Sequence, residues 1–398
     1  MPSPIQNKRI VLGVTGSIAC YKAADLASKL VQSGALVDTV LTEAAREFVS
    51  ELTFKSLTHR EVHTSLYSPN SNLSINHVAL AESADLIIVA PATANTIAKI
   101  ANGISDDVLT TTILATTAPI IIAPAMDANM FDNPATEANV TTLIGRGFFI
   151  AGPAEGRLAS GLMGKGRMIE PFDIMGAASM LLGKDGDLSG KKIVVSAGGT
   201  EEAIDPVRNI TNRSSGKMGY AIAEAARDRG AMVSLVAAPN HLAKPIGISV
   251  TNIQSAEDMK KAIEDECLEA DALIMAAAVA DWRPLEKLDS KAKKDKSDHW
   301  SLELVKNPDI VAGINSSKLI KVGFAAESEN LVENSKTKIE SKNLDFIVAN
   351  DITAADSGFS VDTNRVTIIH PDGTTEVLPL MSKYDVAHSI LDRVKSGF

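Results

Sequence analysis

Cysteine, basic charge and long apolar runs are all scarce in this sequence. Only Cys20 and Cys267 occur among 398 residues, far apart and outside any CxxC pattern. This excludes a disulfide framework and a cysteine zinc site, and predicts two small buried side chains. The formal net charge of −10 leaves no general basic surface for nucleic acid. No apolar stretch reaches the roughly 18 residues of a membrane span, and Met1–Lys8 shows no signal-peptide pattern. We therefore expect a cytoplasmic protein without nucleic-acid or membrane partners.

What remains is the composition of an ordinary globular protein, whose length predicts about two domains. The first half opens with the apolar run Ile10–Val14, a turn at Gly16–Ser17 and a helical pattern over Ala19–Gln32. The same opening returns at Lys191–Val195, followed by Gly198–Thr200. Further expected strands are Leu36–Leu41, Leu86–Ala90, Ile120–Ala123, Phe148–Ala151 and Val233–Ala237, with a helix over Met218–Arg229.

Strands that are apolar throughout and alternate with helices are typical of parallel sheets covered on both faces. The sequence therefore predicts an α/β protein with two Rossmann-like three-layer domains, each a mainly parallel sheet flanked by helices. The glycine-rich, charged segment Gly183–Gly190 is the expected linker, which gives domains at residues 1–183 and 190–398.

The turn at Gly16–Ser17 is a candidate phosphate site, because backbone N–H groups and the helix dipole favour anions there. A dinucleotide site would add G-x-G-x-x-G and an acidic residue at the end of the second strand. Both are missing, and that strand ends in Thr42. Hydroxyls at Thr15, Ser17 and Thr42 suit a phosphomonoester better than an NAD ribose. The alternative that glycine here serves only the turn stays open at this point.

Three further segments and one histidine carry a resemblance. Ala90–Thr96 (APATANT) and Pro124–Phe131 (PAMDANMF) each follow a strand, at the edge where α/β sheets bind ligands. Gly156–Met168 is predicted to be an unstructured, glycine-rich flap. Together with His77 in the stretch NHVAL, these segments resemble the flavin-containing cysteine decarboxylase family over residues 8–182.

The resemblance implies an FMN cofactor and His77 as the active-site base. In this chemistry the flavin oxidises the cysteinyl thiol to a thioaldehyde, which accepts the electron pair when CO2 leaves. The other histidines are expected to be surface or hydrogen-bonded residues; these are His59, His63, His241, His299, His370 and His388. The residues expected to bind FMN are Gly16, Ser17, Thr42, Pro91, Ala92, Thr93 and Asn95.

Four positions depart from the decarboxylase pattern. Asp127 stands where the family has an asparagine that contacts the substrate carboxylate, and two carboxylates close together repel. Ser160 replaces a proton-donating cysteine, Leu162 an aspartate and Phe131 a tryptophan. We expect decarboxylation with the altered groups, so that Asp127 and Ser160 are catalytic together with His77. The alternative is an active ligase that carries a degenerate, flavin-binding decarboxylase domain.

The second half contains five polar blocks in a recognisable order. A P-loop is excluded, because Gly216–Lys217 lies outside any G-x-x-x-x-G-K-[ST] pattern. The half resembles phosphopantothenate–cysteine ligase over residues 190–395, and the fusion resembles the bacterial bifunctional coenzyme A biosynthesis family. The blocks are Gly198–Gly219, Ala276–Trp282 with the lysine-rich run Lys287–Lys296, Val305–Val311, Gly323–Glu327 and Lys338–Asp351.

The ligase resemblance implies CTP, with Mg²⁺ on the triphosphate and no protein ligand assignable to the metal. The phosphopantothenate carboxylate attacks the α-phosphate to form an acyl-cytidylate, which the cysteine amine then attacks. Asn212 and Lys291 are the catalytic residues that this implies. Lys338 and Lys342, four residues apart on an expected helix, can share one face. The residues expected to bind CTP are Asp281, Lys291, Pro308, Asp309, Ile310, Val311, Phe324, Lys338 and Lys342.

The sequence thus predicts a bifunctional enzyme, a carbon–carbon lyase joined to a carbon–nitrogen ligase. Its expected substrates are 4'-phosphopantothenate, cysteine, CTP and phosphopantothenoylcysteine. By resemblance, trimers of the first domain and dimers of the second predict a homo-oligomer that closes as a dodecamer. Two rivals are a flavin-binding regulatory protein, which the ligase blocks disfavour, and an NAD(P) dehydrogenase, which the missing fingerprint disfavours.

Overall fold

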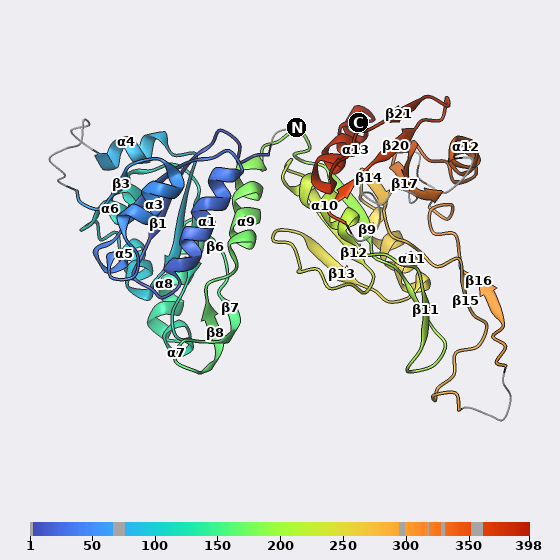
Figure 1. The fold of residues 1–398 in the computed structure, drawn as a ribbon, viewed down its shortest axis with the longest axis horizontal. Coiled ribbons are helices and arrows are strands. Elements are labelled where there is room, and N and C mark those ends of the chain that lie inside the picture. The colour runs from blue at the N-terminus through green and yellow to red at the C-terminus, as the bar shows by residue number, and fades with distance from the viewer. Residues whose placement is uncertain are drawn as a thin grey trace. The chain divides into compact units, whose positions relative to one another are not determined.

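The chain divides into two compact units, Pro2–Leu182 and Gly183–Phe398 (Figure 1). We call them the N-terminal unit and the C-terminal unit. The computed structural model describes residues 3–66, 76–293, 299–314, 316, 318–327, 331–351 and 361–398. Over these residues, no helix combines the length and apolar character needed to cross a bilayer.

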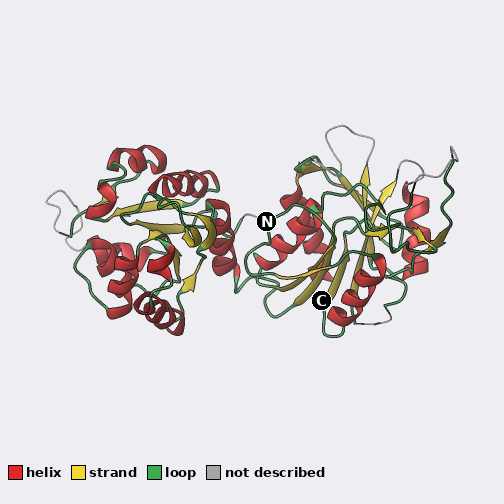
Figure 2. Ribbon diagram, turned by 90° about the horizontal axis from the view of Figure 1, so that it is seen from below, coloured by secondary structure: helices red, strands yellow, loops and turns green. Residues whose placement is uncertain are grey.

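The N-terminal unit is built on a six-stranded sheet in the order β3-β2-β1-β4-β5-β6, with every neighbouring pair parallel. The central strands are buried along their length because helices cover both faces (Figure 2). The strands are β1 (Arg9–Val14), β2 (Leu36–Leu41), β3 (Val62–His63), β4 (Leu86–Ala92), β5 (Ile120–Pro124) and β6 (Phe149–Ile150). This confirms the predicted parallel α/β architecture.

Periodic apolar residues and polar caps define the helices of this unit. In α1 (Cys20–Gln32) the side chains of Ala23, Leu26 and Leu30 are fully buried, as the spacing of an amphipathic helix requires. Thr93 caps the start of α5 with its hydroxyl, and Gly103 ends that helix in the left-handed region. The other helices are α2 (Glu43–Arg46), α3 (Glu51–Thr58), α4 (Asn76–Ser83), α5 (Ala94–Asn102), α6 (Val108–Ala115), α7 (Ala128–Phe131), α8 (Pro134–Gly145) and α9 (Pro171–Gly183).

The predicted unstructured flap is wrong, because this segment forms a β-hairpin. Strands β7 (Ala154–Arg157) and β8 (Met163–Arg167) pair antiparallel. Within the turn that joins them, Leu158 N–H donates to Leu162 O at 2.8 Å and Gly161 N–H donates to Leu158 O at 2.9 Å. The many glycines concealed the strands from the sequence, since glycine is depleted in regular strands.

The C-terminal unit repeats the plan with an eight-stranded sheet in the order β13-β12-β9-β14-β17-β18-β20-β21. The first six strands are parallel and the last two antiparallel. Two apolar clusters cover the two sheet faces. The strands are β9 (Lys192–Ala197), β12 (Met232–Ala237), β13 (Ser249–Asn252), β14 (Ala272–Met275), β17 (Ile320–Glu327), β18 (Phe346–Asp351), β20 (Val366–Ile369) and β21 (Thr375–Val377).

Four helices and three short ribbons complete the C-terminal unit over its described residues. The helices are α10 (Lys217–Arg227), α11 (Ala256–Cys267), α12 (Leu331–Lys342) and α13 (Lys383–Ser396). The ribbons pair β10 (Glu201–Ala203) with β11 (Asn209–Thr211), β15 (Trp282–Pro284) with β16 (Leu304–Lys306), and β19 (Thr363–Asn364) with β22 (Met381–Ser382).

Two details differ from the sequence-based expectations. The expected linker is packed into the C-terminal unit, where Leu188 is fully buried and Asp187 forms a 2.8 Å ion pair with Arg229. A Cβ on Gly183 would lie 1.9 Å from Asp228 O, so this residue is needed for close backbone contact.

The expectation of a surface or hydrogen-bonded residue is wrong for His388, which is 1% exposed with neither ring nitrogen bonded. Both cysteines are buried, as predicted.

Candidate active sites

The candidate flavin site begins where the strand order of the N-terminal sheet reverses, between β1 and β4. Thr15 joins the two strand ends. Its hydroxyl donates to Pro91 O at 2.7 Å and accepts the N–H of Thr93 at 3.0 Å. The Gly16–Ser17 turn and the loop that starts at Pro91 are therefore held side by side. Open α/β sheets bind ligands at such switch points.

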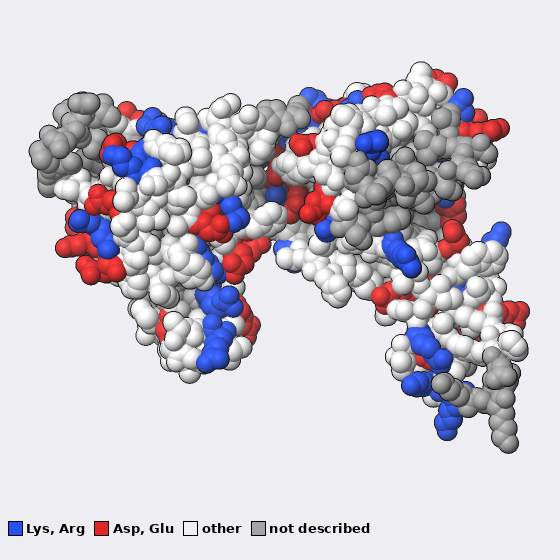
Figure 3. Space-filling model, viewed as in Figure 1, with Lys and Arg blue, Asp and Glu red and all other residues white. Residues whose placement is uncertain are grey.

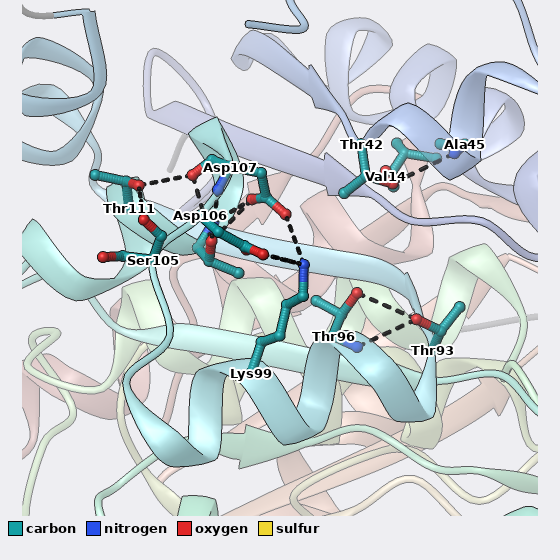
Figure 4. A network of polar contacts seen from close by, with 11 residues as sticks. Val14, Thr42, Ala45, Thr93, Thr96, Lys99, Ser105, Asp106, Asp107 and Thr111 are labelled. Atoms are coloured by element: carbon teal, nitrogen blue, oxygen red, sulfur yellow. Dashed lines mark hydrogen bonds and ion pairs between the residues drawn. The ribbon is translucent and has the colours of Figure 1, made fainter. Parts of the chain in front are cut away.

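Threonine caps and one close backbone contact shape the edge of this site. Thr42 and Thr93 accept the N–H groups of Ala45 and Thr96, each at 3.3 Å, so both hydroxyls are oriented by the helices that they cap (Figure 4). A Cβ on Gly16 would lie 2.6 Å from the Ala44 Cβ. Glycine is therefore required there, and the first helix can start close to α2.

The remaining predicted flavin-site residues are placed as follows. Pro91 and Ala92 are buried at the end of β4, Ser17 is half-buried, and Asn95 is exposed in the first turn of α5. His77 is half-buried in the first turn of α4, a helix that packs against α6. The structure thus groups the expected FMN residues along one sheet edge, with His77 contributed by a separate helix.

Asp127 and Ser160, the two altered catalytic candidates, lie in contact. Ser160 Oγ donates to Asp127 Oδ2 at 2.5 Å, and Asp127 Oδ1 accepts the N–H of Asn129 at 3.1 Å. Asp127 follows β5, the neighbour of β4, and Ala125 N–H donates to Ala92 O at 2.9 Å. The pair therefore belongs to the same sheet edge as the expected flavin loops.

The candidate nucleotide site is a cavity of about 860 Å³ in the C-terminal unit. Among the described residues, six cationic side chains but only two acidic ones line it, although the whole chain carries a formal charge of −10. The cations are Arg213, Lys217, Lys306, Lys338, Lys342 and Lys383, and the acids are Asp281 and Asp309. A locally cationic cavity in an acidic protein is suited to a polyphosphate.

Nine sequence-predicted residues line this one cavity, from five separate chain segments: Asn212, Asp281, Pro308, Asp309, Ile310, Val311, Phe324, Lys338 and Lys342. Asn212 Nδ2 donates to Val279 O at 3.0 Å, which ties the loop before α10 to the loop after β14. At the same edge, Thr200 Oγ1 accepts the N–H of Ala280 at 3.0 Å. This repeats the way in which Thr15 joins two strand ends in the N-terminal unit.

Lys342 and Asp309 form an ion pair in the cavity wall, with Nζ and Oδ2 at 3.0 Å. Burial opposes ionisation of Asp309, but the hydrogen bonds from Lys342 and from the N–H of Ala312 outweigh it and hold the pKa of Asp309 below its ordinary value. Asp309 is therefore anionic at neutral pH and orients Lys342. Lys338 lines the same cavity one helical turn earlier, as the spacing predicts.

Lys291 lies outside the set that lines the cavity, and its side chain is exposed. The loop beside it is anchored, because Arg208 donates to Ala292 O at 3.2 Å and Ala292 N–H donates to Asp205 at 3.2 Å. Hydrogen bonding from Arg208 holds the pKa of Asp205 well below its usual range. Part of the lysine-rich run, residues 294–296, lies outside the described residues.

Lys217 and Lys383 are among the cavity residues that were not predicted as site residues. Lys217 Nζ donates to Asp362 at 2.6 Å, and the Lys383 ammonium donates to the carbonyls of Val361 and Thr363. Burial lowers the pKa of Lys383. A lysine directly at the start of a helix was a sequence signal for Lys217. Lys383 lies more than 150 residues after Lys217 in the chain, and only the fold brings it into the cavity.

Among the described residues, no group of three or more His, Cys, Asp or Glu side chains is arranged to hold a metal ion.

In both units, the loops of the candidate site lie at the switch point of a mainly parallel sheet. Fold and sites together define a class: α/β proteins with two Rossmann-like ligand sites, one in each of two fused units.

Comparisons with known proteins narrow this class. The family model "Flavoprotein" matches residues 1–182, and the model "DNA/pantothenate metabolism flavoprotein C-terminal domain" matches residues 188–398. The coenzyme A biosynthesis bifunctional proteins CoaBC of Bacillus subtilis (strain 168) and Escherichia coli (strain K12) are 47% and 40% identical to the chain. These alignments cover 98% and 99% of this chain, and 97% and 98% of the relatives.

Two solved structures are similar to parts of the chain. The crystal structure of the C-terminal domain of CoaBC covers 53% of this chain and 97% of that chain, with 39% identity and a TM-score of 0.46. A PPC decarboxylase mutant complexed with pantothenoylaminoethenethiol covers 44% of this chain and 97% of that chain, with 32% identity and a TM-score of 0.39.

The chain belongs to the family of bifunctional coenzyme A biosynthesis proteins, CoaBC. It is an enzyme of coenzyme A biosynthesis, with a decarboxylase and a ligase activity. This confirms the family and the two enzyme classes predicted from the sequence, and it confirms a flavoprotein domain. The roles of individual residues stay predictions.

Proposed function

We propose that the C-terminal unit uses CTP to join cysteine to 4'-phosphopantothenate, and that the N-terminal unit decarboxylates the product with FMN to give 4'-phosphopantetheine. One observation carries the ligase part. Six cationic side chains and nine sequence-predicted residues meet in a single cavity of about 860 Å³. A triphosphate needs such charge neutralisation, both when bound and when the α-phosphate is attacked.

In the ligase step, the substrate carboxylate attacks the α-phosphate and pyrophosphate leaves. Lys338 and Lys342 neutralise phosphate charge from α12, while Asp309 keeps Lys342 in place through their 3.0 Å contact. Asn212 lies in the loop before α10 and is held by Val279 O. There its side-chain amide contacts the acyl-cytidylate. Lys291 reaches the cavity from its loop once substrates are bound. Mg²⁺, when bound with the triphosphate, would supply further neutralisation of phosphate charge.

The N-terminal residues fit a flavin phosphate. Thr15 fixes the Gly16–Ser17 turn against the Pro91 loop, and Gly16 allows this turn to approach Ala44 closely. FMN supplies reversible two-electron oxidation of the substrate thiol. His77 acts as the base that removes the thiol proton. A cytoplasmic location and a trimer-based dodecamer stay predictions.

Pyrophosphate release is the assay that tests the ligase assignment. With CTP, cysteine and 4'-phosphopantothenate all present, the protein should release pyrophosphate, and omission of 4'-phosphopantothenate should abolish release. Lys291→Ala should lower kcat/KM about 100-fold, because a cation that stabilises transition-state charge is lost. Lys293→Ala is the matched control: it is an exposed lysine two residues away and should retain full activity.

Equal loss in both lysine variants would contradict a specific role for Lys291. Pyrophosphate release that continues without 4'-phosphopantothenate would contradict the ligase proposal itself. Flavin absorbance should stay unchanged in both variants, because the substitutions lie in the other unit.

A further inference from the structure

The contact between Asp127 and Ser160 joins two of the positions at which the chain departs from the decarboxylase pattern. They lie 33 residues apart in sequence, yet Ser160 Oγ donates to Asp127 Oδ2 at 2.5 Å. The other carboxylate oxygen, Oδ1, accepts the N–H of Asn129 at 3.1 Å. Each oxygen of this carboxylate therefore has a hydrogen-bond donor.

The protein backbone builds this contact. Strand β8 is docked on the segment that precedes α7, because Met126 N–H donates to Gly166 O at 2.9 Å. A Cβ on Gly166 would lie 2.3 Å from Met126 O, and one on Gly164 would lie 2.8 Å from the Ala128 Cβ. The glycines thus allow a hairpin position that a larger residue would forbid, and this position brings Ser160 to Asp127.

An aspartate and an asparagine at position 127 would treat Ser160 differently. An amide would cap α7 with its oxygen and offer its N–H to the serine oxygen, which leaves the hydroxyl proton free for a third group. A carboxylate can only accept hydrogen bonds. The Ser160 hydroxyl therefore donates its hydrogen bond to Asp127 and has no proton left to offer a third group. The observed bond follows the second pattern. Ser160 therefore does not simply replace a proton-donating thiol.

This inference rests on the proposed decarboxylase function. We propose that Asp127 and Ser160 act as one proton-donating pair, in which Asp127 in its acid form gives a proton to the carbon that loses CO2. The Ser160 hydroxyl then stabilises the carboxylate that remains. Asp127 is the catalytic residue of the pair and Ser160 its positioning residue.

The step balances in atoms and electrons. The bond between carbon and the substrate carboxylate breaks and CO2 leaves. Its electron pair passes into the thioaldehyde, which gives an enethiolate that can bind a proton at the carbon that lost CO2. That carbon forms a new bond to the proton of Asp127, so one proton is consumed for each CO2 released. The electron pair that FMN takes from the thiol is returned in the same turnover, so no further oxidant or reductant is needed. Solvent then reprotonates Asp127.

Substrate binding supplies the acid form of Asp127. Two carboxylates placed together repel, and one of them binds a proton. Three basic and two acidic side chains lie on β7, on β8 and at the end of α7. A blue stripe in Figure 3 covers the part of the unit where Figure 1 shows β7 and β8. The charged groups are Arg157, Lys165, Arg167, Glu155 and Asp132.

Four variants of the full chain test the pair with synthetic phosphopantothenoylcysteine and CO2 detection. Asp127→Asn should lower kcat about 100-fold, the effect of losing a positioned acid. Ser160→Ala should lower kcat about 10-fold through loss of one charge-assisted hydrogen bond. Ser160→Cys alone should bring no gain. Asp127→Asn combined with Ser160→Cys should recover at least about 10-fold over Asp127→Asn, because an amide leaves the thiol proton free.

The pH profile separates proton donation from mere docking of the hairpin. The wild-type rate should fall at alkaline pH, where the proton that the pair donates is lost. Ser160→Ala removes a donor that stabilises the ionised form, so this alkaline limb should move up by about one pH unit. A purely structural role for Ser160 would lower the rate and leave the limb where it is.

Failure of this inference is distinguishable from failure of the proposed function. If the wild-type protein binds FMN but releases no CO2, the decarboxylase function is overturned and the pair with it. If the wild type is active and Asp127→Asn is equally active, or if the limb does not move in Ser160→Ala, the pair alone is overturned. Flavin absorbance and pyrophosphate release verify that each variant is folded.

Discussion

At the scale of single residues, a threonine hydroxyl in each unit bonds across the switch point of the sheet. Thr15 bonds to Pro91 O and to Thr93 N–H, and Thr200 bonds to Ala280 N–H. Each hydroxyl joins two strand ends at a switch point and so holds two ligand-binding loops together. The sequence shows these threonines, but their partners lie 76 to 80 residues away, and only the sheet order makes them neighbours.

The buried side chain of His388 leads to a prediction at this scale. Burial lowers its pKa to about 4 from 6.5, and its ring packs edge-on against Tyr384 at 4.6 Å between centroids. As pH falls from 6.5 to 4, the unfolded chain binds a proton that the folded chain refuses, so the stability of the C-terminal unit decreases. Below pH 4 the full decrease in the free energy of unfolding is present, and it amounts to roughly 3 kcal/mol.

The substitution His388→Leu should therefore remove roughly 3 kcal/mol of the loss in free energy of unfolding between pH 7 and pH 4. Urea denaturation of both proteins at the two pH values measures this difference, in which the titration of carboxylates cancels. His241→Leu, at an exposed position, is the control and should leave the pH dependence unchanged. Identical pH dependence in wild type and His388→Leu would refute the assignment.

At the scale of elements, the β7–β8 hairpin is the feature that the sequence concealed. Its strands carry glycines at positions 156, 164 and 166, which indicated a loop. In the structure these glycines permit close contact instead: Gly166 has a φ of 158° and its backbone is bonded to Met126. Low strand propensity was overridden by pairing and by docking on the segment before α7.

Gly166→Ala should therefore displace the hairpin, because the added Cβ would lie 2.3 Å from Met126 O. We expect about a 100-fold loss of CO2 release, the effect of misplacing a catalytic group by about 1 Å, with pyrophosphate release unchanged. The control Gly145→Ala lies in open space at the end of α8 and should be neutral. Unchanged CO2 release by Gly166→Ala would show that hairpin docking does not matter for catalysis.

At the scale of the whole molecule, the two units carry separate cores and separate sites. The candidate flavin residues all lie in Pro2–Leu182 and the cavity residues all lie in Gly183–Phe398. Part of the expected linker belongs to the C-terminal unit, because Asp187 and Leu188 are packed into it. The candidate residues for each reaction therefore lie within one unit.

Separate sites predict separable activities. His77→Asn should lower CO2 release from phosphopantothenoylcysteine about 1,000-fold through loss of a catalytic base, and leave CTP-dependent pyrophosphate release intact. Asn212→Ala should do the reverse, with CO2 release intact when phosphopantothenoylcysteine is supplied directly. Both assays on both variants measure this. Parallel loss of the two activities in either variant would contradict it.

The sequence by itself determined the parallel sheets and the family. Runs such as Leu86–Ala92 are apolar along their whole length. A motif such as APATANT is a local property that chain folding does not alter. Tertiary structure alone decided which distant residues share a site. Ser160 reaches Asp127, and Lys383 enters the cavity of Asn212, because strand order and hairpin docking, which depend on long-range packing, set these neighbours.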